Sequence, residues 1–182
     1  HIYDWGRYPK ELSNNTNLLI TEFKKMADKL LSEIHNNSPN EVKNSYSMPL
    51  NHMIKDSSTN LLRVIHYPPI NDNKVPSAIR AGAHEDINLI TLLVAGSEPG
   101  LQVLSQDNKW VDVSTSSEYI VVNIGDMLQE CSGGYFPSTT HRVINPSDKN
   151  MSRYSMPFFV HARDDVSLSK KYTAKSYLEE RL

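Results

Sequence analysis

The spacing of apolar residues along the chain changes once, near residue 60. Before that point, apolar side chains recur every three or four positions, which is typical of one face of an α-helix. The residues of this stripe are Leu19, Phe23, Met26, Ala27, Leu30, Leu31 and Ile34. The pattern predicts a helix from about residue 16 to the Asn-Asn-Ser-Pro turn at 36–39, and a second, weaker helix over about 40–54.

After residue 60 the pattern is typical of short strands. Segments rich in β-branched and aromatic residues alternate with turn residues, among them Asp126 after Gly125. The predicted strands cover residues 61–67, 79–84, 88–95, 101–104, 109–113, 118–124, 139–144 and 153–160. Eight strands with no helix between them predict an antiparallel sandwich or barrel, and the polar stretch after Ser169 predicts a final helix.

Composition narrows the class of protein. The 182 residues are 38% hydrophobic and 22% charged, and a chain of this length can bury about 70% of its unfolded surface. The net charge is −2 and no basic run exceeds two residues, so we expect no nucleic-acid partner. No apolar run approaches the roughly 20 residues of a membrane helix, so we expect no membrane partner. The single cysteine, Cys131, which we interpret as a packed residue, favours a reducing, cytoplasmic location.

Three polar residues suggest a metal site. His84 and Asp86 are two positions apart in a predicted strand, so their side chains would share one face while Glu85 points away. His141 lies 55 residues after Asp86 in another predicted strand, where it shares a face with Val143. A single strand histidine more often makes a structural hydrogen bond. Two histidines and one carboxylate, however, are the ligand set of non-haem iron sites, with zinc as the competing metal.

A possible anion site follows 12 residues after His141. Arg153 and Ser155 also share a strand face, and the planar guanidinium fork suits a carboxylate. Apolar residues follow closely, so we expect Arg153 to point into a partly apolar cavity, where it would need an anion. His66 faces away from Tyr67 by alternation, and we interpret His161, at a strand exit, as facing solvent.

These motifs together resemble the Fe(II)/2-oxoglutarate-dependent dioxygenase superfamily, in the branch that includes isopenicillin N synthase. The family's HxD…H motif matches His84, Asp86 and His141, and its RxS motif matches Arg153 and Ser155. The flanking runs that also match are Tyr67-Pro-Pro69, Leu89-Ile-Thr-Leu-Leu93, Pro99-Gly-Leu-Gln-Val103, Asn123-Ile-Gly-Asp-Met-Leu128 and His141-Arg-Val143. The resemblance is strong between residues 62 and 166 and weak outside them.

The resemblance implies a mainly β fold with flanking helices, the double-stranded β-helix or jelly roll. It implies Fe(II), 2-oxoglutarate as cosubstrate and O2, with Arg153 and Ser155 holding the far carboxylate of 2-oxoglutarate and Tyr67 also reaching it. Plant members of the family often carry Asn two positions before that tyrosine, whereas this chain has Ile65. The expected activity is oxidation of a C–H bond in a small molecule (hydroxylation, desaturation or cyclisation), with release of succinate and CO2.

We expect residues 1–60 to form an N-terminal helical region that is incomplete at its start, 61–166 the oxygenase core, and 167–182 a C-terminal helix. Phe159 is the candidate for the substrate pocket. Two alternatives stay open: an Fe(II) oxidase of the isopenicillin N synthase type that does not use 2-oxoglutarate, and a non-catalytic jelly-roll binding module. The sequence leaves the substrate and the oligomeric state open.

Overall fold

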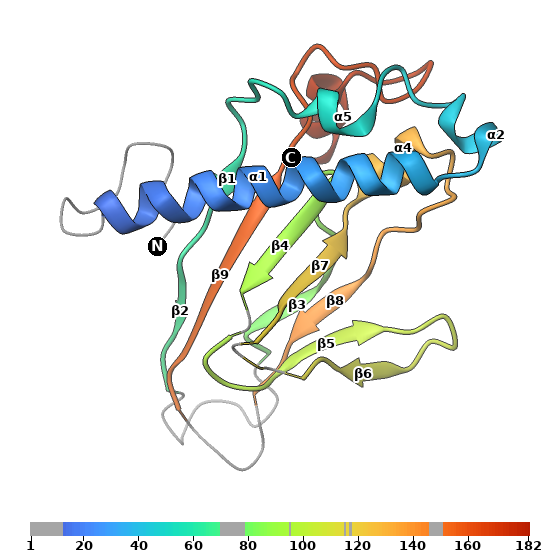
Figure 1. Cartoon of the computed structure of the whole chain (residues 1–182). Coiled ribbons are helices and arrows are strands. Elements are labelled where there is room, and N and C mark those ends of the chain that lie inside the picture. The colour runs from blue at the N-terminus through green and yellow to red at the C-terminus, as the bar shows by residue number, and fades with distance from the viewer. Residues whose placement is uncertain (1–12, 70–78, 95, 115, 117, 146–150) are drawn as a thin grey trace.

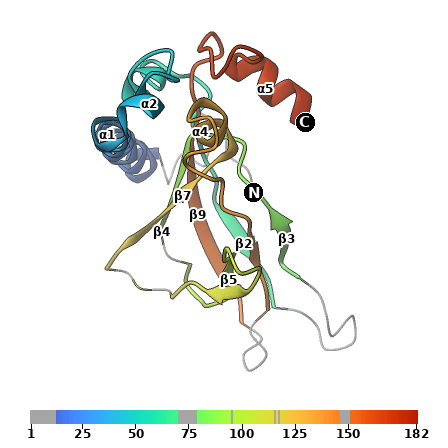
Figure 2. The same cartoon turned by 90° about the vertical axis from the view of Figure 1, so that its right-hand side faces the viewer.

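The protein folds into two antiparallel sheets with helices along one side and at one end (Figure 1). This computed structural model describes residues 13–69, 79–94, 96–114, 116, 118–145 and 151–182. Residues 1–12 of the expected N-terminal region and position 95 of one predicted strand lie outside the described residues. The turned view shows the long helix α1 on one side of the larger sheet and the strand β3 of the smaller sheet on the other (Figure 2).

The predicted first helix is confirmed as α1 (Ser13–Asn37), which begins three residues earlier than the apolar stripe indicated. Its buried face comprises Ile20, Phe23, Ala27 and Leu31, whereas Met26 is exposed. The ring of Phe23 stacks on that of Phe158 at a centroid distance of 5.3 Å. This contact fastens the helix to the outer face of the larger sheet.

The single weak helix expected over 40–54 is wrong. The structure has two short helices there, α2 (Asn40–Lys43) and α3 (Leu50–Met53). Pro39 precedes the first and Pro49 the second. Proline has no backbone N–H and disfavours a helical conformation in the residue before it, so a continuous helix cannot run through Pro49.

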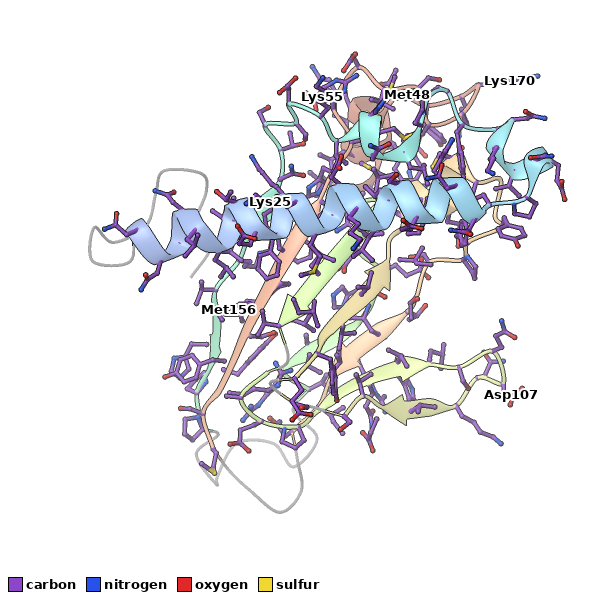
Figure 3. The ribbon with its side chains drawn as sticks, in the orientation of Figure 1. Lys25, Met48, Lys55, Asp107, Met156 and Lys170 are labelled. Atoms are coloured by element: carbon purple, nitrogen blue, oxygen red, sulfur yellow. The ribbon has the colours of Figure 1, made fainter. Side chains whose placement is uncertain are left out.

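All eight predicted strand regions contain strands, and the first of them is split in two. The larger sheet consists of β1 (Leu61–Leu62), β2 (Ile65–Tyr67), β4 (Ile90–Val94), β7 (Ile120–Ile124) and β9 (Arg153–Val160). The smaller sheet consists of β3 (Ala81–His84), β5 (Leu101–Leu104), β6 (Trp110–Asp112) and β8 (His141–Val143). Asp107 lies at the tip of the β5–β6 hairpin (Figure 3), and Asn108 beside it has φ 57°. The mainly β fold class is confirmed.

Strand β9 separates the hydrophobic core from the interior between the two sheets. Its side chains alternate between two faces, as in any strand. Phe158 and Val160 are buried in the core beneath α1. Arg153 and Ser155 point to the opposite face and line a cavity. One strand therefore supplies both the helix-covered core and the polar groups of the interior.

The expectation of no helix among the strands is wrong. Helix α4 (Asp126–Cys131) lies between β7 and β8, because the apolar residues after Asp126 face the core with helical spacing. The second helix of this half is α5 (Ala174–Arg181), which is shorter than the expected 167–182. Before it, Ser167 and Thr173 form an isolated antiparallel bridge.

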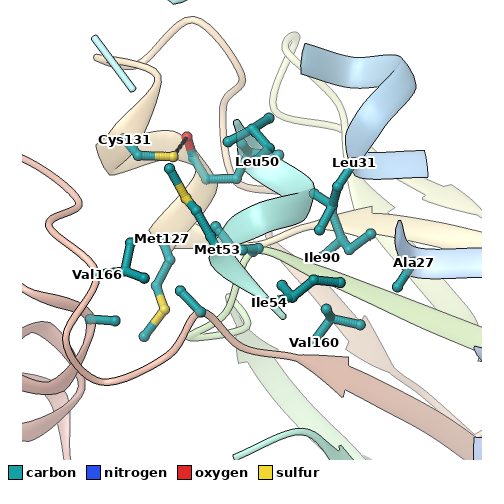
Figure 4. Close-up of a cluster of buried hydrophobic side chains, with 14 of the residues drawn as sticks. Ala27, Leu31, Leu50, Met53, Ile54, Ile90, Met127, Cys131, Val160 and Val166 are labelled. Carbon is teal, nitrogen blue, oxygen red and sulfur yellow. Dashed lines mark hydrogen bonds between the residues drawn. The ribbon is translucent and has the colours of Figure 1, made fainter. Parts of the chain in front are cut away.

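One hydrophobic cluster joins the described parts of the chain. It includes residues of α1, α3, α4, β4, β9 and the segment before α5, ten of which are labelled in Figure 4. Cys131 is buried in it, and burial raises the pKa of its thiol to about 12. Its expected role as a packed residue is confirmed. The division into residues 1–60, 61–166 and 167–182 stays a prediction.

Candidate metal centre and active site

Two histidines and one carboxylate meet at the edge of the smaller sheet. His84 ends β3 and His141 begins β8, and the two are direct neighbours across the antiparallel pair. Asp86 Oδ1 lies 3.9 Å from His84 Nε2 and 3.8 Å from His141 Nε2. The three ligand-type atoms all lie within 4.8 Å of one another. The structure thus brings together the three residues predicted from the sequence.

The two imidazole rings are oriented by backbone carbonyl groups. His84 Nδ1 lies 2.7 Å from the carbonyl oxygen of Gly82, and His141 Nδ1 lies 2.9 Å from that of Thr139. A carbonyl oxygen only accepts, so each Nδ1 must carry the proton and donate it. Each Nε2 then has a free lone pair, as a metal-binding histidine requires, and lies within 4.8 Å of the other two ligand-type atoms.

The carboxylate of Asp86 is held by two polar side chains that the sequence analysis did not single out. Asp86 Oδ2 accepts hydrogen bonds from Thr91 Oγ1 at 2.6 Å and from Asn123 Nδ2 at 3.1 Å. Asn88 Nδ2 donates in turn to Thr91 Oγ1 at 2.8 Å. These contacts fix one carboxylate oxygen and leave Oδ1 facing the histidines. Thr91 in β4 and Asn123 in β7 are polar residues in otherwise apolar strands, and this feature of the sequence could have identified them.

The sequence argument for Asp86 was right about proximity but wrong about its cause. Asp86 lies in the loop after β3, two residues past the end of the strand, so strand alternation does not place it. The loop conformation is fixed instead by the amide of Asp126, which donates to the carbonyl oxygen of Asp86 at 2.9 Å. Glu85 does point away, and accepts a hydrogen bond from Thr140.

Arg153 is buried on the interior face of β9, with 1% of its surface exposed. Its Nε donates to the carbonyl oxygen of Glu98 at 3.0 Å, while its Nη1 is buried without a hydrogen-bond partner among the described residues. Burial lowers the pKa of Arg153. None of the ion pairs found in the described part of the chain includes it. A buried guanidinium N–H without a partner among the described residues is a position where an anion would be favoured.

Gly96 provides the space for this guanidinium. A β-carbon at that position would lie 2.5 Å from Arg153 Nη2, closer than non-bonded atoms approach. Tyr67 lies on the other side, with its ring centroid 5.6 Å from Arg153 Cζ. Strand pairing places Tyr67 directly opposite Arg153 in β9. His66, as expected, faces outward, where it stacks on Tyr154.

A cavity of about 170 Å³ connects the histidine–aspartate cluster with Arg153. Its polar lining includes His84, Asp86, His141, Arg153 and Ser155. Its apolar lining includes Ile65, Leu93, Leu101, Val103, Val121, Val143, Pro157 and Phe159. The seven candidate residues from the sequence, including Tyr67 and Phe159, therefore all line one cavity. Ile65 makes the wall apolar at its position.

Two expectations about polar residues near this site are wrong. His161 does not face solvent: its Nδ1 is buried without a hydrogen-bond partner among the described residues, and burial lowers its pKa. Asp126 is not a simple turn residue: it is buried at the start of α4 and pairs with Arg181 at 3.1 Å. In both cases residues distant in the sequence lie against the polar residue, so the local sequence does not predict its burial.

Comparison with known proteins shows the family. The sequence model of the 2OG-Fe(II) oxygenase superfamily matches residues 58–162, which is more than half of the chain. The chain belongs to this superfamily, and the resemblance noted from its motifs is confirmed. The family name specifies the groups its members use, Fe(II) and 2-oxoglutarate. In the described part of the chain, no helix is long and apolar enough to cross a membrane.

This chain matches only part of the length of relatives whose names state a function. Gibberellin 2-beta-dioxygenase 3 of Arabidopsis thaliana is 35% identical over 141 residues, which are 77% of this chain and 40% of the relative. A 2-oxoglutarate-Fe(II) type oxidoreductase of Aspergillus fumigatus is 37% identical over 105 residues, 57% of this chain and 31% of the relative. The chain thus spans between about a third and two fifths of the length of these relatives.

Solved structures show the same fold. A protein of Shewanella oneidensis superposes with a TM-score of 0.92 at 50% identity, over 99% of this chain and 68% of that one. A Neurospora crassa protein, solved in complex with alpha-KG and thymine, superposes with a TM-score of 0.77 at 26% identity, over 97% of this chain and 60% of that one. The two-sheet architecture is therefore the one that this oxygenase family uses.

Proposed function

We propose that the protein is an Fe(II)- and 2-oxoglutarate-dependent oxygenase that oxidises a C–H bond of a small molecule and releases succinate and CO2. One observation carries this proposal: a single cavity contains both a cluster of two histidines and a carboxylate and a buried guanidinium nitrogen without a partner among the described residues. Membership of the superfamily supports it.

His84, Asp86 and His141 are the metal ligands in this proposal. Their donor atoms fit the role, because each Nδ1 is engaged with a backbone carbonyl and the two Nε2 atoms lie 3.9 and 3.8 Å from Asp86 Oδ1. Three ligands from one side leave the other positions for the cosubstrate and O2, and this set is typical of non-haem Fe(II) oxygenases. When bound, Fe(II) and 2-oxoglutarate supply the oxidising chemistry, and the protein positions them.

Arg153 binds the far carboxylate of 2-oxoglutarate, and its Nη1, which has no partner among the described residues, is the donor that this contact would satisfy. Ser155 lies on the same face of β9 and adds a hydroxyl group. The ring of Tyr67 packs against the guanidinium and limits its movement. Apolar walls exclude water around these polar groups, which strengthens each electrostatic contact.

The substrate is a small molecule in this proposal, and the place of action is the cytoplasm, with no nucleic-acid or membrane partner. A net charge of −2 without basic runs and a single, buried thiol support this part. The acidic residue between two proposed ligands, Glu85, has no role in the chemistry, because it is exposed and directed to Thr140.

Succinate formation tests the proposed function. The purified full-length protein is supplied with Fe(II), 2-oxoglutarate and O2, with and without candidate substrates. We expect succinate, with turnover that rises when the correct substrate is added. Fe(II)-dependent O2 consumption without succinate would favour the oxidase, and binding of neither metal nor 2-oxoglutarate would favour the non-catalytic module.

A substitution of one ligand tests the metal centre separately. We expect His141→Ala to weaken metal binding by at least roughly 100-fold, because only two ligands remain. The apo protein should keep its unfolding midpoint, since the ring is only partly buried and its Nδ1 donates to one backbone carbonyl, that of Thr139. Strong destabilisation of the apo variant with unchanged metal affinity would instead assign His141 a structural role.

A further inference from the structure

A second guanidinium group lines the same cavity. Arg63 is part of the lining, and its Nε is buried without a hydrogen-bond partner among the described residues. Its Cζ lies 5.0 Å from the centroid of the Phe159 ring, which restrains the guanidinium plane. No ion pair within the described ranges includes Arg63. Its charge is therefore uncompensated by the described residues.

Arg63 and Arg153 belong to different ends of the cavity. The segment from Arg63 to Tyr67 runs antiparallel to β9. The amide of Arg63 donates to the carbonyl oxygen of Pro157, and Tyr67 is paired with Arg153. Tyr67 follows Arg63 by four positions, which is about 13 Å along an extended chain. The carboxylate that Arg153 holds in the proposed function is thus taken as separate from the group that Arg63 contacts.

Strand pairing places Phe159, and Arg63 over its ring, at the end of the cavity that holds the histidine–aspartate cluster. Phe159 in β9 is paired with Thr91 in β4, and the hydroxyl group of Thr91 donates to Asp86 Oδ2. Arg153, in contrast, is paired with Tyr67. A molecule that contacts Arg63 and Phe159 would therefore lie near the cluster, where a substrate must present the bond that reacts.

We propose that Arg63 and Phe159 anchor the primary substrate, and that this substrate is a small molecule carrying a carboxylate. This inference rests on the proposed function, since it takes Arg153 as the site of 2-oxoglutarate. Arg63 is half-buried, and its buried Nε has no partner among the described residues, which favours an anion over a neutral group. The planar fork of arginine matches the two oxygens of a carboxylate, and the Phe159 ring offers an apolar surface for the body of the molecule.

Binding of matched acids and amides tests the inference. The wild-type protein is loaded with Mn(II) and saturating 2-oxoglutarate, so that no turnover occurs. It is then titrated calorimetrically with phenylacetate and phenylacetamide, and with cyclohexanecarboxylate and its amide. We expect the acids to bind roughly 10- to 100-fold more tightly than the amides, as expected for one charge-assisted contact.

Three variants assign that preference to a residue. Arg63→Gln should abolish the difference between acid and amide, and Arg63→Lys should keep part of it because the charge remains. Arg142→Gln is the matched control, since that guanidinium stacks on Trp110 at 4.0 Å and does not line the cavity. It should retain the full preference.

Mn(II) and 2-oxoglutarate binding are measured on the same samples, so that the two proposals fail differently. Wild-type protein that binds neither contradicts the proposed function. Wild-type protein that binds both, but binds acids and amides alike or binds no probe, overturns only the role of Arg63. Acid preference that survives in Arg63→Gln overturns it as well.

Discussion

Replacing Arg153 with leucine should separate cosubstrate binding from metal binding. Arg153 is 1% exposed, and its Nη1 has no partner within the described residues, so these residues leave its charge uncompensated. Removing one member of a buried, charge-assisted pair costs about 2–4 kcal/mol. We therefore expect Arg153→Leu to weaken 2-oxoglutarate binding by roughly 30- to 700-fold.

The same substitution should have little effect on the apo protein. Arg153 makes one charge-assisted bond to the Glu98 carbonyl, but it also carries the cost of a buried charge, which lowers its pKa. Exchange of a buried charge for a hydrophobic residue is often neutral. We expect the free energy of unfolding of the apo variant to change by no more than about 1 kcal/mol.

Calorimetric titration of the Mn(II)-loaded protein with 2-oxoglutarate gives the affinity, and urea unfolding of the apo protein gives the stability. Metal affinity is measured separately and should be unchanged. Arg142→Leu, which removes a guanidinium outside the cavity, is the control. Unchanged 2-oxoglutarate affinity, or a joint loss of metal and 2-oxoglutarate binding, would refute the division of roles between Arg153 and the histidine–aspartate cluster.

Two further predictions concern the surroundings of the metal cluster. Thr91→Val removes the 2.6 Å hydrogen bond to Asp86 Oδ2 at nearly constant side-chain volume. Metal affinity, measured by Mn(II) titration, should therefore fall by roughly 10- to 100-fold. Unchanged affinity would show that Asn123 alone holds the carboxylate. Burial raises the pKa of Asp126 to about 6 in spite of the nearby Arg181. The folded protein therefore holds the carboxyl proton of Asp126 more tightly than the unfolded chain does. As the pH rises from about 4 to above 6, the free energy of unfolding should fall by up to about 3 kcal/mol. Asp126→Asn cannot ionise and should be more stable than wild type at about pH 8 but not at about pH 4 in urea unfolding, and an equal difference at both pH values would contradict this.

The sequence predicted much of the candidate site because the proposed chemistry requires particular residue types. A histidine–aspartate pair and a distant histidine together predicted a metal-ligand set, and Arg153 with Ser155 predicted an anion site. Strand alternation, which depends only on local backbone geometry, correctly put Arg153, Ser155 and Tyr67 on interior faces.

Local pattern failed where a contact from elsewhere in the chain decides. Asp86 converges on the histidines through a loop held by the amide of Asp126, not through strand alternation. The burial of Asp126 depends on α4 and on Arg181, 55 positions later. Neither contact can be predicted from the residues that neighbour it in the sequence.

The sequence by itself determined the strand regions, the long first helix and the residue types of the proposed metal and anion sites, because these follow from side-chain period and donor chemistry. Only the tertiary structure decided which polar groups of the described residues remain without partners inside the cavity. The unpaired Nη1 of Arg153 and Nε of Arg63 result from the way strands distant in sequence enclose them. Hydrogen-bond satisfaction is a property of the assembled interior, and no local pattern encodes it.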